Sequence, residues 1–190
     1  MSKYRLFFFI IVIIIFWSSI FIEILGITDS SYVGFSVDSR QNLYVGRSRY
    51  IEVFDKYGAK IRQFPSMTSQ GYAFKVVDNN LVIATSTFIY TMNLDGEIID
   101  KQEDRSARLI NEFKGSAHDF TLDNETSYKS LSFLGYHIII RYQGQNKDIV
   151  YRMPEKDYIN QILRLFSVII FIYIVASMFI NNIRRDVKKE

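Results

Sequence analysis

The side chains that could catalyse proton transfer or hold a metal ion are few in this chain and show no recognisable spacing. Its 190 residues include two histidines, His118 and His137, and no cysteine. Neither histidine belongs to an H-E-x-x-H pattern, and no G-x-S-x-G turn is present to expose a nucleophilic serine. We therefore expect an exposed His118, a partly packed His137, and a non-catalytic chain with no metal ligand and no cofactor.

Two acidic residues stand in short turn motifs. Asp55 and Gly58 form a D-x-x-G turn, and Asp95 and Gly96 belong to an L-D-G turn. Aspartate at such positions accepts hydrogen bonds from nearby backbone amides, and glycine adopts the left-handed backbone that closes the turn. The D-x-D-x-D-G pattern of a calcium loop is absent from the sequence. These residues are therefore predicted to be turn formers. Carboxylate pairs for glycoside hydrolysis come together through the fold and not through spacing, so a hydrolase is the third alternative for the function.

The two ends of the chain are apolar segments of a length suited to cross a membrane. Residues 6–22 and 165–180 contain no charged side chain. A helix that crosses a hydrocarbon core of about 30 Å needs about 20 mostly apolar residues. We therefore predict transmembrane helices over 6–25 and 162–183. A cleaved signal peptide is the alternative for the first segment, but its apolar stretch is longer than usual and no small-x-small cleavage site follows it.

Basic residues next to these segments predict their orientation. They precede the first segment and follow the second: Lys3, Arg5, Arg184, Arg185, Lys188 and Lys189. Cytoplasmic flanks of membrane helices are enriched in lysine and arginine. Both ends, residues 1–5 and 184–190, are therefore predicted to be cytoplasmic, and residues 28–158 to form a domain outside the plasma membrane. The lipid bilayer is accordingly the first expected partner.

The net charge of +3 reflects this orientation and not a polyanionic ligand. Residues 28–163 contain 16 Lys/Arg and 17 Asp/Glu, so the excess of positive charge lies in the membrane segments and their flanks. A domain that binds nucleic acid is instead expected to carry a basic surface. We therefore expect no nucleic-acid partner.

The region between the apolar segments contains a repeat of short predicted strands. Residues 42–45 (NLYV) correspond to residues 80–83 (NLVI), 38 positions later and without a gap, and Gly58 corresponds to Gly96 at the same offset. A period near 40 residues with about four short strands per unit is typical of β-propeller blades, which stack because one small sheet cannot bury both of its faces. Blade-like units are predicted over 33–64, 72–101 and 124–153.

The first of these units is similar to an NHL-type β-propeller repeat. Its sequence VDSRQNLYVGRSRYIEVFDKYGAKIRQF matches the family pattern of Asp, a polar turn, Gly/Asn-Leu-Tyr-Val, Ile-x-Val-Phe and Asp-x-x-Gly. The segment VVDNNLVIATSTFIYTMNLDGEII resembles a more divergent blade, and NETSYKSLSFLGYHIIIRYQGQNKDIVYRMP resembles a third. The resemblance implies a mainly β domain of stacked antiparallel blades.

The number of blades differs from that of a closed propeller. This chain has room for about three, whereas propellers close with about four to eight. The blades are therefore expected either to form an open stack covered by other segments or to complete a ring with other chains. Residues 101–114 supply a candidate cover, because they place Ala107, Ile110 and Phe113 at helical spacing, with Gly115 as a stop.

The expected work of such a chain is binding. The partner would be another protein, a surface polymer or a second copy, and a homo-oligomer could form through the β domain or the helices. The alternative is an accessory subunit of a larger membrane complex, with the β domain as a lid or scaffold. Asn124 begins an N-E-T sequon, which would face outward and accept a glycan in a eukaryotic host.

Overall fold

The protein divides into two compact units. The computed structural model describes residues 3–29, 31–68, 71–115, 118–122 and 125–186. One unit, here called the helical unit, contains residues 1–30 and 154–190, and the other, the β domain, contains residues 31–153. The prediction of a mainly β chain with an apolar helix at each end is confirmed.

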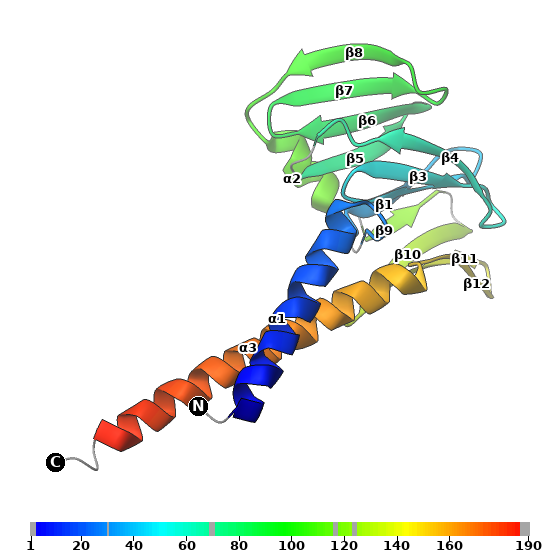
Figure 1. Ribbon diagram of the computed structural model, residues 1–190. Helices are drawn as coiled ribbons and strands as arrows, with labels where there is room; N and C mark the ends of the chain where they lie inside the picture. Colours follow the sequence, from blue (N-terminus) through cyan, green and yellow to red (C-terminus); the bar gives the residue numbers. More distant parts are fainter. Residues whose placement is uncertain (1–2, 30, 69–70, 116–117, 123–124, 187–190) are drawn as a thin grey trace. The chain divides into compact units, whose positions relative to one another are not determined.

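The helical unit consists of two long helices, α1 (Lys3–Ile24) and α3 (Glu155–Asp186) (Figure 1). Their segments Phe7–Ile24 and Glu155–Ser177 are long and apolar enough to cross a membrane. Only 11% of each segment is buried within the protein, so packing in a soluble core does not account for the composition. A helix that is apolar on every side is typical of a buried or membrane-spanning segment.

Polar side chains join the two helices at the end of α1. Asn160 Nδ2 donates hydrogen bonds to Ser19 O at 3.2 Å and to Thr28 Oγ1 at 3.0 Å. Arg164 of α3 forms an ion pair with Glu23 of α1. Hydrogen bonds between helices stabilise their association in a membrane, where water does not compete. These contacts therefore pair the Asn160 amide and the charges of Arg164 and Glu23 at this end of the helix pair.

The β domain contains three antiparallel sheets of four strands each. The first sheet comprises β1 (Gly34–Val37), β2 (Leu43–Gly46), β3 (Tyr50–Phe54) and β4 (Lys60–Pro65). The second comprises β5 (Tyr72–Val77), β6 (Asn80–Thr85), β7 (Phe88–Asn93) and β8 (Ile98–Glu103). The third comprises β9 (Asp119–Thr121), β10 (Thr126–Phe133), β11 (Tyr136–Gln143) and β12 (Asn146–Arg152). In each sheet the strands are hydrogen-bonded in chain order.

The first two sheets repeat each other in register. Leu43 pairs with Phe54 in the first sheet, and Leu81 pairs with Met92 in the second, at the offset of 38 positions found in the sequence. A β-bulge adjoins Phe54 in β3, and a second adjoins Met92 in β7. Bulges re-aim a strand and strengthen its twist. The sequence repeat is therefore a structural repeat that includes its irregularity.

The predicted D-x-x-G turn closes the hairpin between β3 and β4. Asp55 Oδ1 accepts the backbone N–H groups of Tyr57 and Ala59, both at 2.9 Å. Gly58 has a φ of +87°, in the left-handed region that glycine enters without steric penalty. A short polar side chain and a glycine thus fix the turn.

The corresponding turn between β7 and β8 uses a different residue from the one predicted. Asn93 Oδ1 accepts the backbone N–H groups of Asp95 and Glu97, at 3.0 and 2.9 Å, and Gly96 has a φ of +97°. The carboxylate of Asp95 instead accepts a hydrogen bond from Arg62 of β4 at 3.2 Å. Asn93 lies at the position equivalent to Asp55, so the amide replaces the carboxylate as the turn acceptor.

In the turn between β1 and β2, Gln41 occupies the position that Gly58 and Gly96 occupy in the two turns described above. Its φ is +67°, and the left-handed conformation costs a non-glycine residue roughly 1 kcal/mol. We expect Gln41→Gly to raise the free energy of unfolding by about 0.5–1 kcal/mol. Urea denaturation of the full chain in detergent, followed by near-ultraviolet circular dichroism, measures it. Gln143→Gly, at an exposed strand end, is the control and should lower the free energy of unfolding. A lower free energy of unfolding for Gln41→Gly as well would contradict the claim that the backbone at Gln41 is strained.

The first sheet lies between the other two (Figure 1), and its strands β1 and β2 are buried on both faces, whereas its edge strand β4 is largely exposed. Successive side chains of a strand point to opposite faces. Ile51 and Val53 of β3 enter a hydrophobic cluster shared with the second sheet. On the opposite face, Phe54 packs edge-on against Tyr151 of β12, with ring centroids 5.3 Å apart. The core of the β domain therefore extends through all three sheets.

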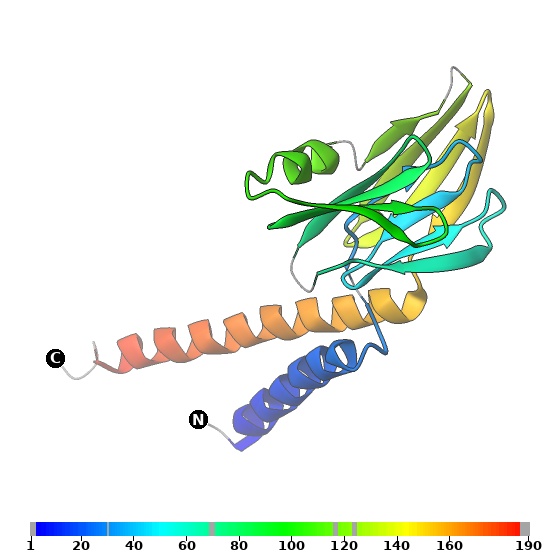
Figure 2. The ribbon, with the colours of Figure 1, turned by 90° about the horizontal axis from the view of Figure 1, so that it is seen from above.

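A short helix, α2 (Arg108–Gly115), covers the outer face of the second sheet (Figure 2). Its Ile110 and Phe113 pack with Ala73 of β5 and Ala84 of β6. Small alanine side chains let the helix approach the sheet closely. The far face of the second sheet is thereby shielded over β5 and β6.

The helix predicted over 101–114 is wrong at its start. Residues 101–103 belong to β8 and pair with β7, so sheet pairing overrides their helix-forming composition. The predicted stop agrees with the structure, because α2 ends at Gly115.

Candidate binding site

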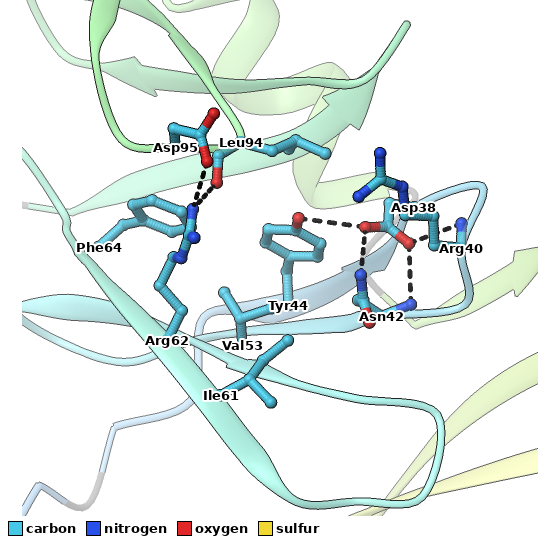
Figure 3. A pocket seen from close by; sticks show the side chains of 10 residues that line it. All are labelled: Asp38, Arg40, Asn42, Tyr44, Val53, Ile61, Arg62, Phe64, Leu94 and Asp95. Atoms are coloured by element: carbon cyan, nitrogen blue, oxygen red, sulfur yellow. Dashed lines mark hydrogen bonds and ion pairs between the residues drawn. The ribbon is translucent and has the colours of Figure 1, made fainter.

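A pocket of about 190 Å³ lies between the first sheet and the β7–β8 turn of the second sheet (Figure 3). Its walls come from the β1–β2 turn, from β2, β3 and β4, and from the β7–β8 turn. The lining residues are Asp38, Arg40, Asn42, Tyr44, Val53, Ile61, Arg62, Phe64, Leu94 and Asp95. Two of the recurring turns thus contribute to one pocket.

Asp38 fixes the turn that forms one wall. Its Oδ1 accepts the backbone N–H groups of Arg40 and Asn42, at 2.9 and 2.8 Å. Its Oδ2 accepts hydrogen bonds from Asn42 Nδ2 at 2.8 Å and from the Tyr44 hydroxyl at 3.3 Å. The residue is only 2% exposed. A buried carboxylate with this many donors holds the backbone of the turn in place.

Tyr44 presents its ring and hydroxyl at the centre of the pocket. Burial, together with the charge and hydrogen bond of Asp38, raises the pKa of the Tyr44 hydroxyl well above its ordinary value. The hydroxyl therefore stays protonated at neutral pH and remains a donor. Its ring lies nearly parallel to that of Phe64, with centroids 6.5 Å apart. The two rings give the pocket an aromatic wall.

Arg62 of β4 closes the pocket on the side of the second sheet. Its Nη1 donates hydrogen bonds to Leu94 O and to Asp95 Oδ1. The guanidinium carbon lies 5.9 Å from the centre of the Phe64 ring. The Asp95 side chain is 82% exposed, and ion pairs this exposed contribute little to stability. Arg62 can therefore exchange Asp95 for a carboxylate of a ligand at small cost.

Arg40 lies across Tyr44 from Arg62 (Figure 3). Its backbone N–H donates to Asp38. Within the part of the chain that the structure describes, its guanidinium forms no hydrogen bond and no ion pair. Arginine binds carboxylate and phosphate groups through paired N–H donors. The pocket thus offers one available guanidinium and one weakly held guanidinium on either side of a tyrosine.

These side chains can bind an anionic group. The two arginines are donors for an anionic group, and Val53 and Ile61 supply an apolar floor. Pockets of this kind combine apolar walls with a few placed polar groups that orient the ligand. An acidic side chain or an acidic sugar of a polymer matches these donors.

The two histidines lie away from this pocket. His118 is exposed, and His137 is half-buried with its ring stacked on Tyr32, centroids 4.1 Å apart. Burial, together with the nearby charge of Arg47, lowers the pKa of His137, so its ring is neutral at pH 7. Among the described residues, no group of three or more His, Cys, Asp or Glu side chains is arranged to hold a metal ion.

The remaining sequence-predicted residues divide between described and undescribed parts of the chain. Asp55 and Gly58 lie in the β3–β4 turn, outside the pocket, whereas Asp95 lies in its wall next to Gly96. Lys3 and Arg5 belong to α1 and Arg184 and Arg185 to α3, whereas Lys188, Lys189 and Asn124 lie outside the described residues.

Sequence reasoning did not single out Asp38, Arg40 or Arg62. The first had a signal, because it is the leading aspartate of the repeat and stands four residues before an asparagine, at the spacing of its two backbone hydrogen bonds. The arginines had none. Arg62 meets Leu94, 32 positions away, only because two sheets stack face to face.

The fold and the pocket define a class of protein: a mainly β domain with a candidate anion-recognising pocket, carried between two apolar helices. Comparison with protein-family models and with curated proteins found no significant match to this chain.

Proposed function

We propose that this chain is a two-pass membrane protein that presents a propeller-like β domain outside the plasma membrane and binds a protein or surface polymer there. The observation that carries the binding role is the guanidinium of Arg40, which faces Arg62 across Tyr44 and has no partner among the described residues. The ligand contributes an acidic group, which takes Arg40 and displaces Asp95 from Arg62. The role is non-catalytic.

The membrane part of the proposal rests on the helical unit. Two segments of sufficient length and apolarity flank the β domain in the chain. Basic residues concentrate in the sequence beyond the outer end of each segment, which favours cytoplasmic termini. The β domain then lies on the opposite side of the membrane.

The blade interpretation rests on the repeated architecture. Equal registers, equivalent bulges and a shared turn geometry in the first two sheets are what NHL-type blades would produce. Three blades are fewer than a closed propeller needs. The β domain is therefore an open stack of blades, with α2 covering one end.

An accessory-subunit role is the alternative, and one feature of the helical unit favours it. A groove of about 320 Å³ runs between α1 and α3, lined by Val12, Ile13, Phe16, Trp17, Ser167, Val168 and Phe171. Small and aromatic side chains in such a groove suit the packing of a further membrane helix.

A crosslinking experiment on intact cells tests both the pocket and its side of the membrane. The chain has no cysteine, so Ile61→Cys adds a single thiol to the pocket wall, where Ile61 is 55% exposed. A membrane-impermeant maleimide photocrosslinker applied from outside is expected to label it and to join one partner. Addition of Arg40→Gln should reduce that crosslink about ten-fold, because an arginine–carboxylate contact is worth about 1.5–3 kcal/mol.

Tyr57→Cys is the matched control, because Tyr57 is 82% exposed in a turn outside the pocket. It should label equally and should not join the same partner. Labelling of either variant only after permeabilisation would show the opposite orientation. A crosslink that survives Arg40→Gln would exclude the pocket as the binding site.

A further inference from the structure

The hairpin between β10 and β11 ends in an exposed apolar tip. Phe133 is 74% exposed and the neighbouring Leu134 is 60% exposed. Leu131, on the same strand, is 40% exposed. The turn at the opposite end of this sheet, between β11 and β12, consists of the polar or small residues Gly144 and Gln145. Apolar exposure is thus concentrated at one end of the third sheet.

The backbone at this tip is strained in a way that a polar residue would relieve. Leu134 has a φ of +49° and Gly135 a φ of +82°. The turn between β5 and β6 has the same pair of positive φ angles, and there Asp78 and Asn79 occupy it. Two-residue turns of this type favour asparagine, aspartate and glycine, and leucine is disfavoured. The exposed leucine therefore carries both a conformational and a solvation penalty, which points to a role outside the fold.

The tip lies at the end of the sheet from which the chain enters α3. Arg152, the last residue of β12, pairs with Ile138 of β11. Tyr136, which pairs with Phe133 at the tip, lies two residues before Ile138 on β11, so the tip extends about 7 Å past Arg152 at the same end of the sheet. Only two residues separate Arg152 from Glu155, the first residue of α3. Three backbone steps of about 3.8 Å cover at most about 11 Å. The chain therefore leaves the third sheet for α3 at the same end as the hairpin tip.

We infer that Phe133 and Leu134 insert into the interface of the bilayer that α3 crosses. The inference rests on the proposed membrane-spanning role of α3. Burial in the interface removes the solvation penalty of the two side chains and offsets the strain at Leu134. Arg152 is exposed at this same end of the sheet, and an arginine there can pair with lipid phosphates. The bilayer thus restrains the β domain at a second point besides its covalent connections.

Fluorescence quenching by brominated lipid tests this contact. Trp17 is the single tryptophan of the chain, so Trp17→Phe gives a background for new probes. In that background Phe133→Trp is compared with Ile169→Trp, in the candidate span of α3, and with Tyr57→Trp, in an exposed turn of the first sheet. The full chain is reconstituted in phosphatidylcholine vesicles with bromine near either end of the acyl chain.

Phe133→Trp is expected to lose fluorescence at least about two-fold with shallow bromines and less with deep ones, because tryptophan settles at the interface. Ile169→Trp should be quenched by both lipids, and Tyr57→Trp by neither. Quenching at 169 without quenching at 133 would overturn the inference and leave the spanning helix intact. Absence of quenching at 169 would overturn the spanning proposal as well. A blue-shifted but unquenched probe at 133 would show that protein, such as a second copy, covers the tip, and would likewise overturn the inference.

Leu134→Asn separates a membrane role from a structural one. Asparagine suits the turn, so the variant is expected to unfold at the same or a higher temperature than the parent. In the Phe133→Trp background it should reduce the shallow quenching at least about two-fold, because one of two inserted side chains is removed. Unchanged quenching would show that Leu134 does not enter the bilayer.

Discussion

Replacement of Arg47 by alanine is expected to lower the free energy of unfolding by about 3 kcal/mol. Arg47 follows β2 and is 1% exposed, among the largest fully buried side chains of the described residues. Its Nη1 donates a hydrogen bond to the Tyr151 hydroxyl of β12 at 3.0 Å. Its carbonyl oxygen accepts the hydroxyl hydrogen bond of Tyr72 from β5 at 2.6 Å. One residue thus joins all three sheets.

The size of the effect comes from two losses. Truncation at Cβ leaves a cavity between the first and third sheets that the surrounding strands cannot close, because each is fixed by its ladder. It also removes the Arg47 N–H group that donates a hydrogen bond to the Tyr151 hydroxyl oxygen. Burial raises the pKa of that hydroxyl well above its ordinary value and keeps it protonated. The backbone contact with Tyr72 survives, so the second sheet stays attached.

Urea denaturation of the full chain in detergent measures the change. Near-ultraviolet circular dichroism is the suitable signal, since the packed tyrosines lie in the β domain and the single tryptophan lies in α1. Arg105→Ala is the control, because that side chain is 78% exposed and its loss should change stability by less than about 0.5 kcal/mol. Tyr151→Phe should cost about 1–2 kcal/mol, and less than that when Arg47 is already alanine. A loss for Arg47→Ala no larger than that of Arg105→Ala would contradict the bridging role.

Arg47 also shows where sequence reasoning stops. In the sequence it stands in G-R-S-R-Y, a polar stretch that looks like an ordinary exposed hairpin turn. Its burial depends on Tyr151, 104 positions away, and no local pattern encodes that contact. The strands around it were predictable, because alternation and turn residues are local, and the offset of 38 residues transferred the assignment from the first sheet to the second.

One part of the pocket could likewise be predicted from the sequence, and another part could not. The turn at Asp38 follows from local spacing, as its acceptor bonds reach only two and four residues along the chain. The approach of Arg62 to Asp95 follows from the stacking of two sheets and has no counterpart in the sequence. Residues 101–103 show a local prediction that fails. Their composition favours a helix, but pairing with β7 makes them part of a strand.

Gly46→Ala is expected to lower the free energy of unfolding by about 2–3 kcal/mol, because the added methyl group has no room. Gly46 ends β2, next to side chains of β5. A Cβ there would lie 2.5 Å from Phe74 Cε1 and 3.1 Å from the Tyr72 hydroxyl oxygen. The Tyr72 hydroxyl cannot retreat without breaking its hydrogen bonds to Arg47 O and Tyr50 O, at 2.6 and 3.1 Å. The sheets must therefore separate or Phe74 must leave its rotamer.

The chain supplies both a control and a rescue for this prediction. Gly71→Ala adds the same methyl group where no atom of the described residues beyond its chain neighbours lies within 4 Å, and it should change stability by less than about 0.5 kcal/mol. Phe74→Leu removes Cε1, the atom closest to the added methyl group, and alone should cost about 1 kcal/mol, whereas in the Gly46→Ala background it should restore at least half of the loss. Additive losses in the double variant would mean that the methyl group is accommodated elsewhere and that Phe74 does not set the spacing. Sub-additive losses would instead identify the Gly46–Phe74 contact as the point at which two blade-like sheets set their separation, since only a shared contact makes one substitution compensate for the other.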